Sequence, residues 1–293
     1  MISVIIPARN ERFLQKTISD LLAKAKGDIE VIAVLDGYWP PVQLVDHKNL
    51  VILHRGKPRG MRLGINDAAA MARGKYILKT DAHCMFDEGF DLKLIADCEK
   101  DWVVIPRRYR LDAEDWCINK DRQASIDHLY VCYPDNPNDF GGPTLTGREW
   151  RDYARKRNDI LIDDLMTFQG SCWFMHRDYF FELDGLDNEK YGTFGKEPQE
   201  IGFKAWLSGG RVVRNKKTWY AHLHKGRKYG RGYSLGKSML HKGGKAINQW
   251  LVFGKAWDKQ TLDLKWLVDK FAPVPGWDKC DWEDEDWKRS LSE

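Results

Sequence analysis

The sequence has no apolar run long enough to cross a bilayer, and it begins in a strand-like run instead of a basic region followed by an apolar one. We therefore expect no membrane span and no signal peptide, and a cytoplasmic location is the simplest expectation. The six cysteines form no CxxC pair. This pattern argues against a structural zinc site and is typical of reduced, mostly buried thiols.

Two phosphate-binding motifs are missing as well. The loop that contains Gly56, Pro58 and Gly60 fits neither GxxxxGK[ST] nor GxGxxG, so it is neither a P-loop nor a dinucleotide fingerprint.

The net charge of +4 is too small to indicate a partner by itself. The 293 residues are 43% hydrophobic and 31% charged, a globular composition long enough for one large domain or two small ones.

Short apolar runs alternate with amphipathic segments in the first third of the chain. Leu14, Ile18 and Leu21 recur at helical spacing, for example, between two runs rich in isoleucine and valine. The expected strands cover residues 2–7, 29–35, 50–54, 76–80 and 102–106, and the expected helices cover residues 13–24, 61–72 and 89–101. Strands that alternate with helices form parallel neighbours joined by right-handed crossovers. The sequence therefore predicts an α/β fold, with a mostly parallel, Rossmann-like sheet flanked by helices.

The stretch KYILKTDAHCMF, residues 75–86, combines a strand signal with potential metal ligands. Residues 76–80 have the length and composition of a buried strand, and Asp81 and His83 follow directly. Along an extended backbone residues i and i+2 point to the same side, so both side chains are expected to reach one cation. A carboxylate and an imidazole suit Mn²⁺, Zn²⁺ or Co²⁺, and two protein ligands leave positions open for phosphate oxygens. The alternative is that both are surface residues of a turn.

Other polar residues are expected at the same edge of the sheet. Asp36 follows the strand expected over residues 29–35, and ligands of open α/β sheets bind at the carboxyl ends of the strands. The alternative for Asp36 is a turn residue beside Gly37. Arg59 and Arg62 stand at the start of an expected helix, whose amino terminus would help them to meet an anion.

Five segments in this order resemble one family of enzymes. VIIPARNE, EVIAVLDG and RLGINDAAAMARGKYILKTDAHC are similar to the nucleotide-binding half of GT-A glycosyltransferases, and DAH in place of Asp-x-Asp is similar to the polypeptide N-acetylgalactosaminyltransferases. GSCWFMHRDYFFELDGLDNEKYGTFGKEPQEIGFKAWLSGGRV resembles the acceptor-side segment of that family, and TWYAHLHKGRKYGRGY resembles its Gly-His segment and the basic loop after it. The resemblance covers residues 1–250 and implies a single GT-A catalytic domain of a hexosyl- or N-acetylhexosaminyltransferase.

The resemblance implies a metal centre that binds the donor. Asp81, His83 and His222 would hold a divalent cation, Mn²⁺ or Mg²⁺, and the diphosphate of a UDP-sugar would complete the coordination. His224 is the alternative to His222, because only two residues separate them. The cation would neutralise the charge that develops on the departing diphosphate.

The resemblance also implies contacts to the nucleotide. Asp36 would hold the uracil or the ribose through its carboxylate. Arg62 would contact the nucleotide or the diphosphate, with Arg59 as the alternative one helical turn away. Arg9, which comes just after the first strand, belongs to the same expected donor-binding set.

Two carboxylates at the start of a probable helix are the catalytic candidates. Glu197 would point to the sugar and the acceptor, and either Glu197 or Glu200 could serve as the base that an inverting enzyme needs. The similar family retains configuration without such a base, so both outcomes stay open. The alternative is that acidic residues simply favour a helix amino terminus. Phe194, Lys196 and Pro198 depart from the family's pattern beside the sugar, so the identity of the sugar does not carry over.

The segment 225–245 is strongly basic and contains no acidic residue. Lys225 and Arg227 are expected to close over the donor diphosphate as part of a flexible loop. A basic stripe with interleaved tyrosines is also typical of proteins that grip a nucleic-acid backbone. The acceptor hydroxyl is therefore expected on a glycan, on a protein or on a hydroxylated base of phage DNA. A non-catalytic nucleic-acid-binding protein is the alternative from another class.

The domain organisation follows from these assignments. Residues 1–255 are expected to form the glycosyltransferase domain, with a nucleotide-sugar half over 1–106 and an acceptor-side half over 107–255. Residues 256–293 form a tryptophan-rich tail that is expected to pack on the domain. No lectin-like repeat follows the catalytic region, which argues against a secretory polypeptide acceptor.

Overall fold

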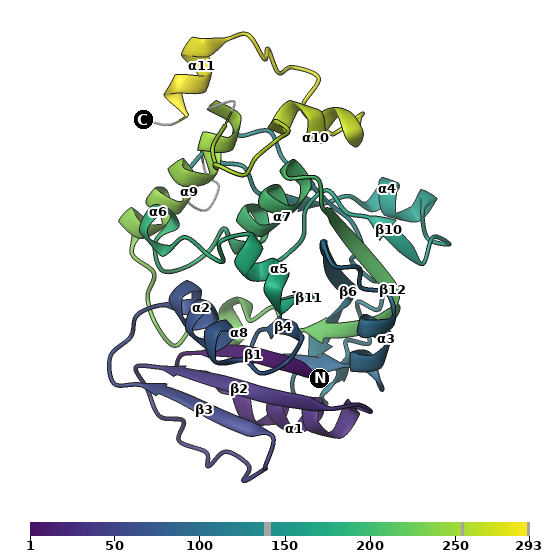
Figure 1. The fold of residues 1–293 in the computed structure, drawn as a ribbon, viewed down its shortest axis with the longest axis vertical. Coiled ribbons are helices and arrows are strands. Elements are labelled where there is room, and N and C mark those ends of the chain that lie inside the picture. The colour runs from purple at the N-terminus through teal and green to yellow at the C-terminus, as the bar shows by residue number, and fades with distance from the viewer. Residues whose placement is uncertain (138–141, 253–254, 292–293) are drawn as a thin grey trace.

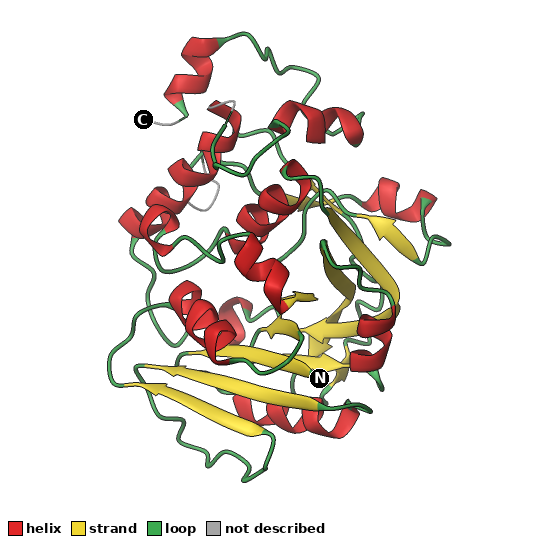
Figure 2. Ribbon diagram, in the orientation of Figure 1, coloured by secondary structure: helices red, strands yellow, loops and turns green. Residues whose placement is uncertain are grey.

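The computed structural model describes residues 1–137, 142–252 and 255–291. A central ten-stranded sheet lies between two groups of helices (Figure 1, Figure 2). The strands are β1 (Ile2–Ala8), β2 (Ile29–Asp36), β3 (Leu50–Arg55), β4 (Tyr76–Thr80), β5 (Cys84–Phe86), β6 (Trp102–Asp112), β7 (Cys117–Ile118), β8 (Leu129–Val131), β9 (Gly147–Glu149), β10 (Ile162–Asp164), β11 (Cys172–His176) and β12 (Arg211–His222). Strands β8 and β9 form a separate two-stranded sheet.

The helices are short, except for one after the last strand. They are α1 (Leu14–Lys24), α2 (Met61–Met71), α3 (Phe90–Ala96), α4 (Arg151–Lys156), α5 (Arg177–Glu182), α6 (Asn188–Tyr191), α7 (Glu197–Leu207), α8 (Gly226–Tyr229), α9 (Lys237–Val252), α10 (Leu264–Lys270) and α11 (Glu285–Ser290). Among the described residues, no helix combines the length and the apolar character that crossing a bilayer would require.

The strand order β10-β12-β6-β11-β4-β1-β2-β3 divides the sheet into two parts. Strands β4, β1, β2 and β3 are mutually parallel neighbours, as the alternation of strands and helices predicts. The antiparallel strand β11 lies between β4 and β6, and β12 then runs parallel to β6. The prediction of an α/β fold with a central sheet flanked by helices is confirmed. The sheet as a whole is mixed and not mostly parallel, because β5, β7, β10 and β11 pair in antiparallel fashion.

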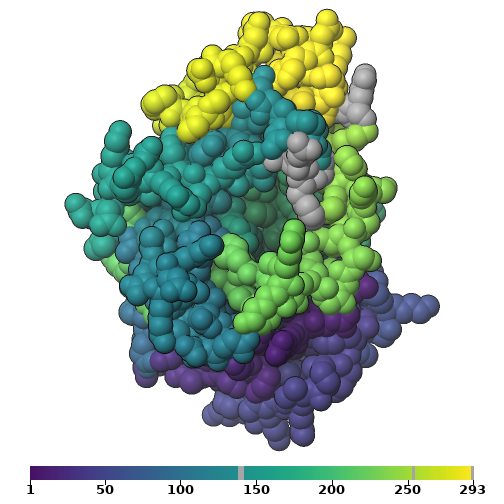
Figure 3. Space-filling model, turned by 180° about the vertical axis from the view of Figure 1, so that it is seen from behind, coloured from purple at the N-terminus to yellow at the C-terminus, as the bar shows by residue number. Residues whose placement is uncertain are grey.

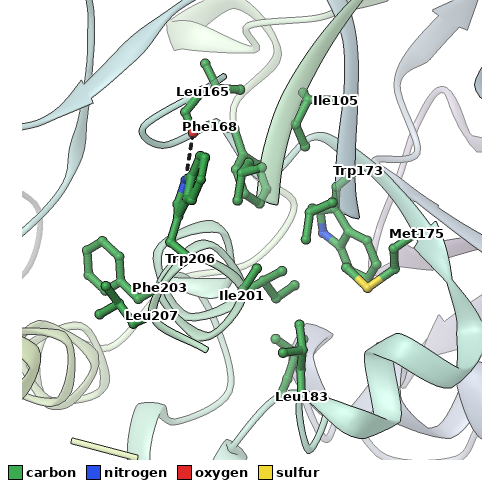
Figure 4. Packing of buried hydrophobic residues seen from close by; sticks show 14 of the residues in the cluster. Ile105, Leu165, Phe168, Trp173, Met175, Leu183, Ile201, Phe203, Trp206 and Leu207 are labelled. Carbon is green, nitrogen blue, oxygen red and sulfur yellow. Dashed lines mark hydrogen bonds between the residues drawn. The ribbon is translucent and has the colours of Figure 1, made fainter. Parts of the chain in front are cut away.

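The sheet is covered on both faces, so neighbouring residues of a strand enter different cores. Val4 and Ile6 of β1 pack in the cluster that contains α1 and α3, while Ile5 between them packs in the cluster that contains α2, α5 and α7. In the second cluster, Trp206 of α7 packs among aliphatic and aromatic side chains and donates its indole N–H to the Leu165 carbonyl at 3.0 Å (Figure 4). Burial on both faces explains why these strands are continuous apolar runs.

Two elements differ in length from the sequence prediction. Strand β6 continues to Asp112 instead of ending near residue 106, because the last part of β12 pairs with its arginine-rich half. Helix α3 ends at Ala96 instead of near residue 101. The next residue, Asp97, leaves the helix and accepts hydrogen bonds from Asn215 and Lys217 of β12.

The tryptophans of the tail contact the rest of the fold. Trp277 is 5% exposed, donates its indole N–H to the Val131 carbonyl at 2.7 Å and stacks with Trp282. Trp287 stacks on Tyr133 with a ring separation of 4.9 Å. These contacts join the tail to the segment that carries β8.

Candidate metal and nucleotide-sugar site

Three potential metal ligands from distant parts of the chain meet at the carboxyl end of β4. One ligand atom each from Asp81, His83 and His222 lie within 4.8 Å of one another. Oδ2 of Asp81 lies 3.4 Å from Nε2 of His222 and 3.8 Å from Nε2 of His83. The last strand brings His222 to this point by pairing with β5, where His222 lies opposite Cys84. The donor set, one carboxylate and two imidazoles, fits Mn²⁺.

The local geometry that joins Asp81 and His83 is not the one that the sequence predicts. Strand β4 ends at Thr80, and residues 81–83 form a turn before β5. The two side chains therefore approach each other through the turn and not through the alternation of an extended strand. The turn is held by the Asp81 amide, which donates to the Ser171 carbonyl at 2.9 Å.

Asp81 is held in its charged form by a lysine underneath it. The Nζ of Lys79 donates to Oδ1 of Asp81 at 2.6 Å and to the Gly170 carbonyl at 2.5 Å, and its side chain is fully buried. Burial would raise the pKa of Asp81, but Lys79 and the two nearby imidazoles lower it well below the ordinary value. Because Lys79 occupies Oδ1, Oδ2 stays turned toward the imidazoles.

His222 has the properties of a metal ligand. Its side chain is 6% exposed, and in the described part of the chain neither ring nitrogen has a hydrogen-bond partner. Burial lowers the pKa of His222 to about 3, so the ring is neutral and can offer a lone pair. A buried nitrogen without a partner is unfavourable unless a ligand satisfies it.

The second imidazole is oriented by a carboxylate from the first loop. Nδ1 of His83 lies 3.3 Å from Oε2 of Glu11, and Nζ of Lys225 lies 2.6 Å from Oε1 of Glu11. Burial would raise the pKa of Glu11, but His83 and Lys225 lower it. A carboxylate behind a histidine is the usual way to fix the ring orientation of a metal ligand.

His224 lies beside the cluster and not inside it. Its ring is 4.9 Å from the ring of His222, and the side chain is exposed. Burial of part of the ring, followed by Arg108 and Arg110, lowers its pKa to about 4. The three-residue cluster contains His222 and not His224, so the geometry favours His222 among the two alternatives.

The cluster of potential metal ligands, Asp81, His83 and His222, hereafter the metal cluster, lies in a cavity of about 980 Å³. The space-filling view shows a hollow between the light-green residues that follow β12 and the teal middle of the chain (Figure 3). The lining comes from the loops after β1, β2 and β4, from the start of α7 and from the segment after β12, and it includes Arg9, Glu11, Asp36, Asp81, His83, Thr146, Gln169, Phe194, Glu197, Gln199, His222, His224, Lys225, Arg231 and Tyr233. A cavity of this size accommodates a ligand as large as a nucleotide-sugar.

Asp36 lines the cavity and also shapes its wall. The Asp36 carboxylate accepts hydrogen bonds from the amides of Arg59 and Gly60 at 2.8 and 2.9 Å, and it pairs with Arg55 at 3.3 Å. These contacts fix the loop that leads into α2. Gly60 and Met61 line the cavity at this point. The Arg59 side chain is exposed and is not among the lining residues.

Arg62 and Glu200 form a buried ion pair away from the cavity surface. Both side chains are 0% exposed. Arg62 also donates to the Gly195 carbonyl at 2.8 Å, and Glu200 accepts from Lys204 at 2.8 Å. Neither residue is among those described as lining the cavity. The structure therefore does not bring these two predicted residues to the donor, and they join α2 to α7.

Glu197 is the carboxylate that does face the cavity. It begins α7, is 6% exposed and has Oε1 4.0 Å from Nζ of Lys79. Burial raises the pKa of Glu197 despite the nearby Lys79 and Arg62. Gly170 packs so tightly against this carboxylate that a Cβ at position 170 would collide with it.

The basic segment after β12 is partly turned toward the cavity. Lys225 lines the cavity and is paired with Glu11, whereas Arg227 is exposed on α8. Arg9 also lines the cavity, and its guanidinium lies 4.9 Å from the centre of the Tyr233 ring. Contacts from the loop after β1 thus hold the start of this segment over the metal cluster.

Two residues of the site are absent from the sequence prediction. Glu11 sits in the Ala-Arg-Asn-Glu stretch directly after the first strand, and an acidic residue at a carboxyl edge was a usable signal. Lys79 gave no signal, because a lysine within an apolar strand suggests an exposed face. Only the packing of Asp81 and Gly170 around its ammonium group explains its complete burial.

The fold matches solved glycosyltransferases. The crystal structure of GalNAc-T7 with UDP, GalNAc and Mn²⁺ aligns with a TM-score of 0.68 and 16% identity over 93% of this chain and 56% of that chain. S. aureus TarS 1-349 in complex with UDP-GlcNAc aligns with a TM-score of 0.56 and 14% identity over 99% of this chain and 79% of that chain. The fold is thus that of the GT-A glycosyltransferases.

Sequence comparison gives the family. Residues 3–183 match the family described as Glycosyl transferase family 2, and the chain belongs to this family. A curated relative, the putative polypeptide N-acetylgalactosaminyltransferase 13 of Drosophila melanogaster, is 25% identical over 237 residues, which are 72% of this chain and 39% of that protein. The chain therefore spans well under half the length of this relative. The predicted resemblance to GT-A glycosyltransferases is confirmed, and membership of an enzyme family argues against the non-catalytic alternative.

Proposed function

We propose that this chain transfers a sugar from a UDP-sugar to a hydroxyl acceptor, with a divalent cation bound by Asp81, His83 and His222. The observation that carries the proposal is the convergence of these three side chains, within 4.8 Å of one another, in a cavity lined by residues from both parts of the chain, 1–106 and 107–255. GalNAc-T7, whose fold is similar, is described with UDP and Mn²⁺, which supports Mn²⁺ in this chain. Bound there, the cation would neutralise the charge on the leaving diphosphate.

We assign separate roles to the residues around the proposed cation site. Lys79 keeps Asp81 ionised and turned toward the imidazoles, and Glu11 orients His83. Lys225 and Arg9, which line the cavity beside the cluster, are placed to meet the diphosphate. Asp36 holds the wall that would face the base and ribose, through its hydrogen bonds to the loop before α2.

Glu197 is the carboxylate proposed to contact the sugar or the acceptor. Glu197 lines the cavity. Because burial raises its pKa, its carboxyl group can exchange a proton nearer neutral pH than that of an exposed glutamate. The buried position of Glu200 supports a structural role for that residue. If the reaction inverts the anomeric carbon, Glu197 is therefore the base that we propose.

We also propose a cytoplasmic enzyme with one catalytic domain. All six cysteines are free, which fits a reducing compartment. Residues 1–255 would act as the glycosyltransferase domain, with 1–106 binding the nucleotide-sugar and 107–255 facing the acceptor. Residues 256–293 would brace it through the contacts of Trp277 and Trp287.

The second candidate concerns the acceptor, a hydroxylated base in DNA. Its support is the segment 225–245, which has no acidic residue and contributes Lys225, Arg231 and Tyr233 to the cavity lining. A basic surface beside the metal would attract the phosphate backbone. A duplex base would have to leave its stack to reach the cavity.

The proposal is tested by following UDP release from a panel of UDP-sugars with Mn²⁺, with and without hydroxymethylated DNA. We expect slow release from one donor alone and faster release with the acceptor. Asp81→Ala should abolish both reactions, while Arg211→Met, on the far end of β12, should retain them. Release that persists in Asp81→Ala would overturn the assignment.

A further inference from the structure

Two arginines of β6, Arg108 and Arg110, lie beside the strand that carries His222, on the edge opposite β5. Strand β6 pairs with β12 so that Arg110 is next to His222 and Arg108 is next to Tyr220. Lateral neighbours in a parallel pair point to the same face. His222 has Cys84 of β5 on one side and Arg110 on the other, so Arg110 lies on the side of His222 opposite β5.

Arg108 is a buried cation without a partner. It is 5% exposed, and within the described part of the chain its guanidinium makes no hydrogen bond or ion pair. Burial lowers the pKa of Arg108, and Arg110 lowers it further. A guanidinium carries five N–H donors, and a largely buried charge without a counter-ion is unfavourable. Such a residue is expected where a ligand supplies the missing anion.

The neighbouring charges leave the pair of arginines positive. Arg110 is 23% exposed in its side chain, and its nearest acid, Glu149, is 3.9 Å away and is also held by Arg151 at 3.3 Å. His224 lines the cavity. Arg108 and Arg110 are not among the lining residues, and Arg110 adjoins the cavity wall as the strand neighbour of His222. Glu149 therefore offsets the positive charge of Arg108 and Arg110 only in part. Tyr220 contributes no negative charge at neutral pH, because burial raises its pKa.

We propose that Arg108 and Arg110 form an acceptor-side anion subsite that binds a phosphate group of the acceptor next to the hydroxyl that is glycosylated. Arginine suits this task because its planar fork matches phosphate oxygens in a bidentate manner. The donor diphosphate is expected on the opposite side of His222, toward Arg9 and Lys225, so the two anions would not compete. This inference rests on the proposed transfer to a hydroxyl acceptor, and it makes that acceptor a phosphodiester polymer. Among such polymers the basic segment 225–245 favours DNA.

Binding of a labelled single-stranded oligodeoxynucleotide tests the subsite without requiring transfer. The measurement is made with saturating UDP and Mn²⁺, so that the donor subsite is occupied. We expect Arg108→Met and Arg110→Met each to weaken binding roughly tenfold or more, because each removes a charge-assisted contact. In the double variant the slope of log K against log salt should decrease by about 1.4, the value for two lost phosphate contacts to a single strand. The matched control is Arg211→Met, which removes an arginine paired with Asp164 at the opposite end of β12 and should bind as the wild type does.

Thermal unfolding separates a ligand-binding arginine from a structural one. Arg214 is 1% exposed and donates to the carbonyls of Asp127 and Pro106, so Arg214→Met should lower the melting temperature. Arg108→Met should leave it unchanged or raise it, because no partner is lost. A marked destabilisation of Arg108→Met, or its failure to fold, would show that the residue is structural and would overturn the proposal. Wild-type binding by Arg110→Met would do the same.

Two further results complete the test. Slow UDP-sugar hydrolysis by the wild-type protein reports on the proposed function alone, so its absence would not be mistaken for failure of the subsite. An oligomer of glycerol phosphate serves as the second probe. If it binds more tightly than the oligonucleotide and depends equally on Arg108, the subsite stands and the acceptor is a polyol phosphate. If neither probe binds at low salt, the subsite does not exist.

Discussion

The Nζ of Lys79 donates a hydrogen bond of 2.6 Å to Oδ1 of Asp81, and this ammonium group is fully buried. The same group lies 4.0 Å from Oε1 of Glu197. One lysine therefore neutralises the carboxylate proposed to bind the cation and the carboxylate proposed to face the sugar. Its position at the end of a central strand connects the stability of the sheet with the charge of the site.

Replacing this lysine should destabilise the whole fold. Lys79→Met leaves Asp81, whose side chain is 23% exposed, without its buried counter-charge, and we expect the free energy of unfolding to fall by about 2–3 kcal/mol, below the range for a fully buried pair. Urea unfolding followed by tryptophan fluorescence measures the change. Lys75→Met, an exposed lysine in the same stretch, should differ from the wild type by about 0.5 kcal/mol or less. A small effect of Lys79→Met would mean that Asp81 is protonated or solvated in the protein.

Replacement of the two histidines near the end of β12 should have different effects on metal binding. His222→Ala removes one of three clustered ligands and should abolish the rise in melting temperature that Mn²⁺ produces in the wild type. His224→Ala should retain the rise, because this side chain lies outside the cluster. Adding EDTA to the wild type should reproduce the melting temperature of His222→Ala. The reverse pattern for the two variants would assign the ligand to His224.

Replacement of the two glutamates of α7 should have different effects, one on catalysis and one on stability. Glu197→Gln keeps the shape of a cavity residue and removes its charge, so we expect kcat for transfer to fall at least about tenfold with little change in stability. Glu200→Gln leaves Arg62 buried and uncompensated, so we expect a loss of about 3 kcal/mol in the free energy of unfolding. Steady-state kinetics and urea unfolding on both variants make the comparison. Equal stability of both variants would contradict the structural role of Glu200.

The stability of the fold should decrease as the pH falls below neutral. His128 is 1% exposed and burial lowers its pKa from 6.5, even though Nε2 lies 3.2 Å from Asp163. Below about pH 6.5 the unfolded chain therefore binds a proton that the folded chain does not. Through this group the free energy of unfolding falls by up to about 1.4 kcal/mol for each unit of decrease in pH. The Asp163 carboxyl, whose pKa is lowered by His128 and Arg157 against the effect of burial, adds a loss at still lower pH.

Comparison of the wild type with His128→Gln isolates this effect. Urea unfolding between about pH 7 and about pH 5 should give a flatter pH dependence in the variant, because its side chain takes up no proton. An unchanged dependence would mean that His128 takes up its proton equally in the folded and the unfolded chain.

Part of the fold could be predicted from the sequence because it is encoded locally. The apolar runs around Val4 and Ile32 and the helical spacing of Leu14, Ile18 and Leu21 indicate strands and helices directly. The boundaries of α3 and β6 were not predictable, because Asp97 and the arginines of β6 are held by residues more than a hundred positions away on β12.

The sequence by itself determined the identity of Asp81, His83 and His222 as candidate ligands and the presence of a cationic segment after β12. Only the tertiary structure decided which candidates meet. It brought His222 to Asp81, took Arg62 and Glu200 into a buried pair, and left Arg108 without a partner beside the strand that carries His222. The physical reason is that local propensity acts over a few residues, whereas burial and electrostatic pairing depend on which distant strands lie side by side.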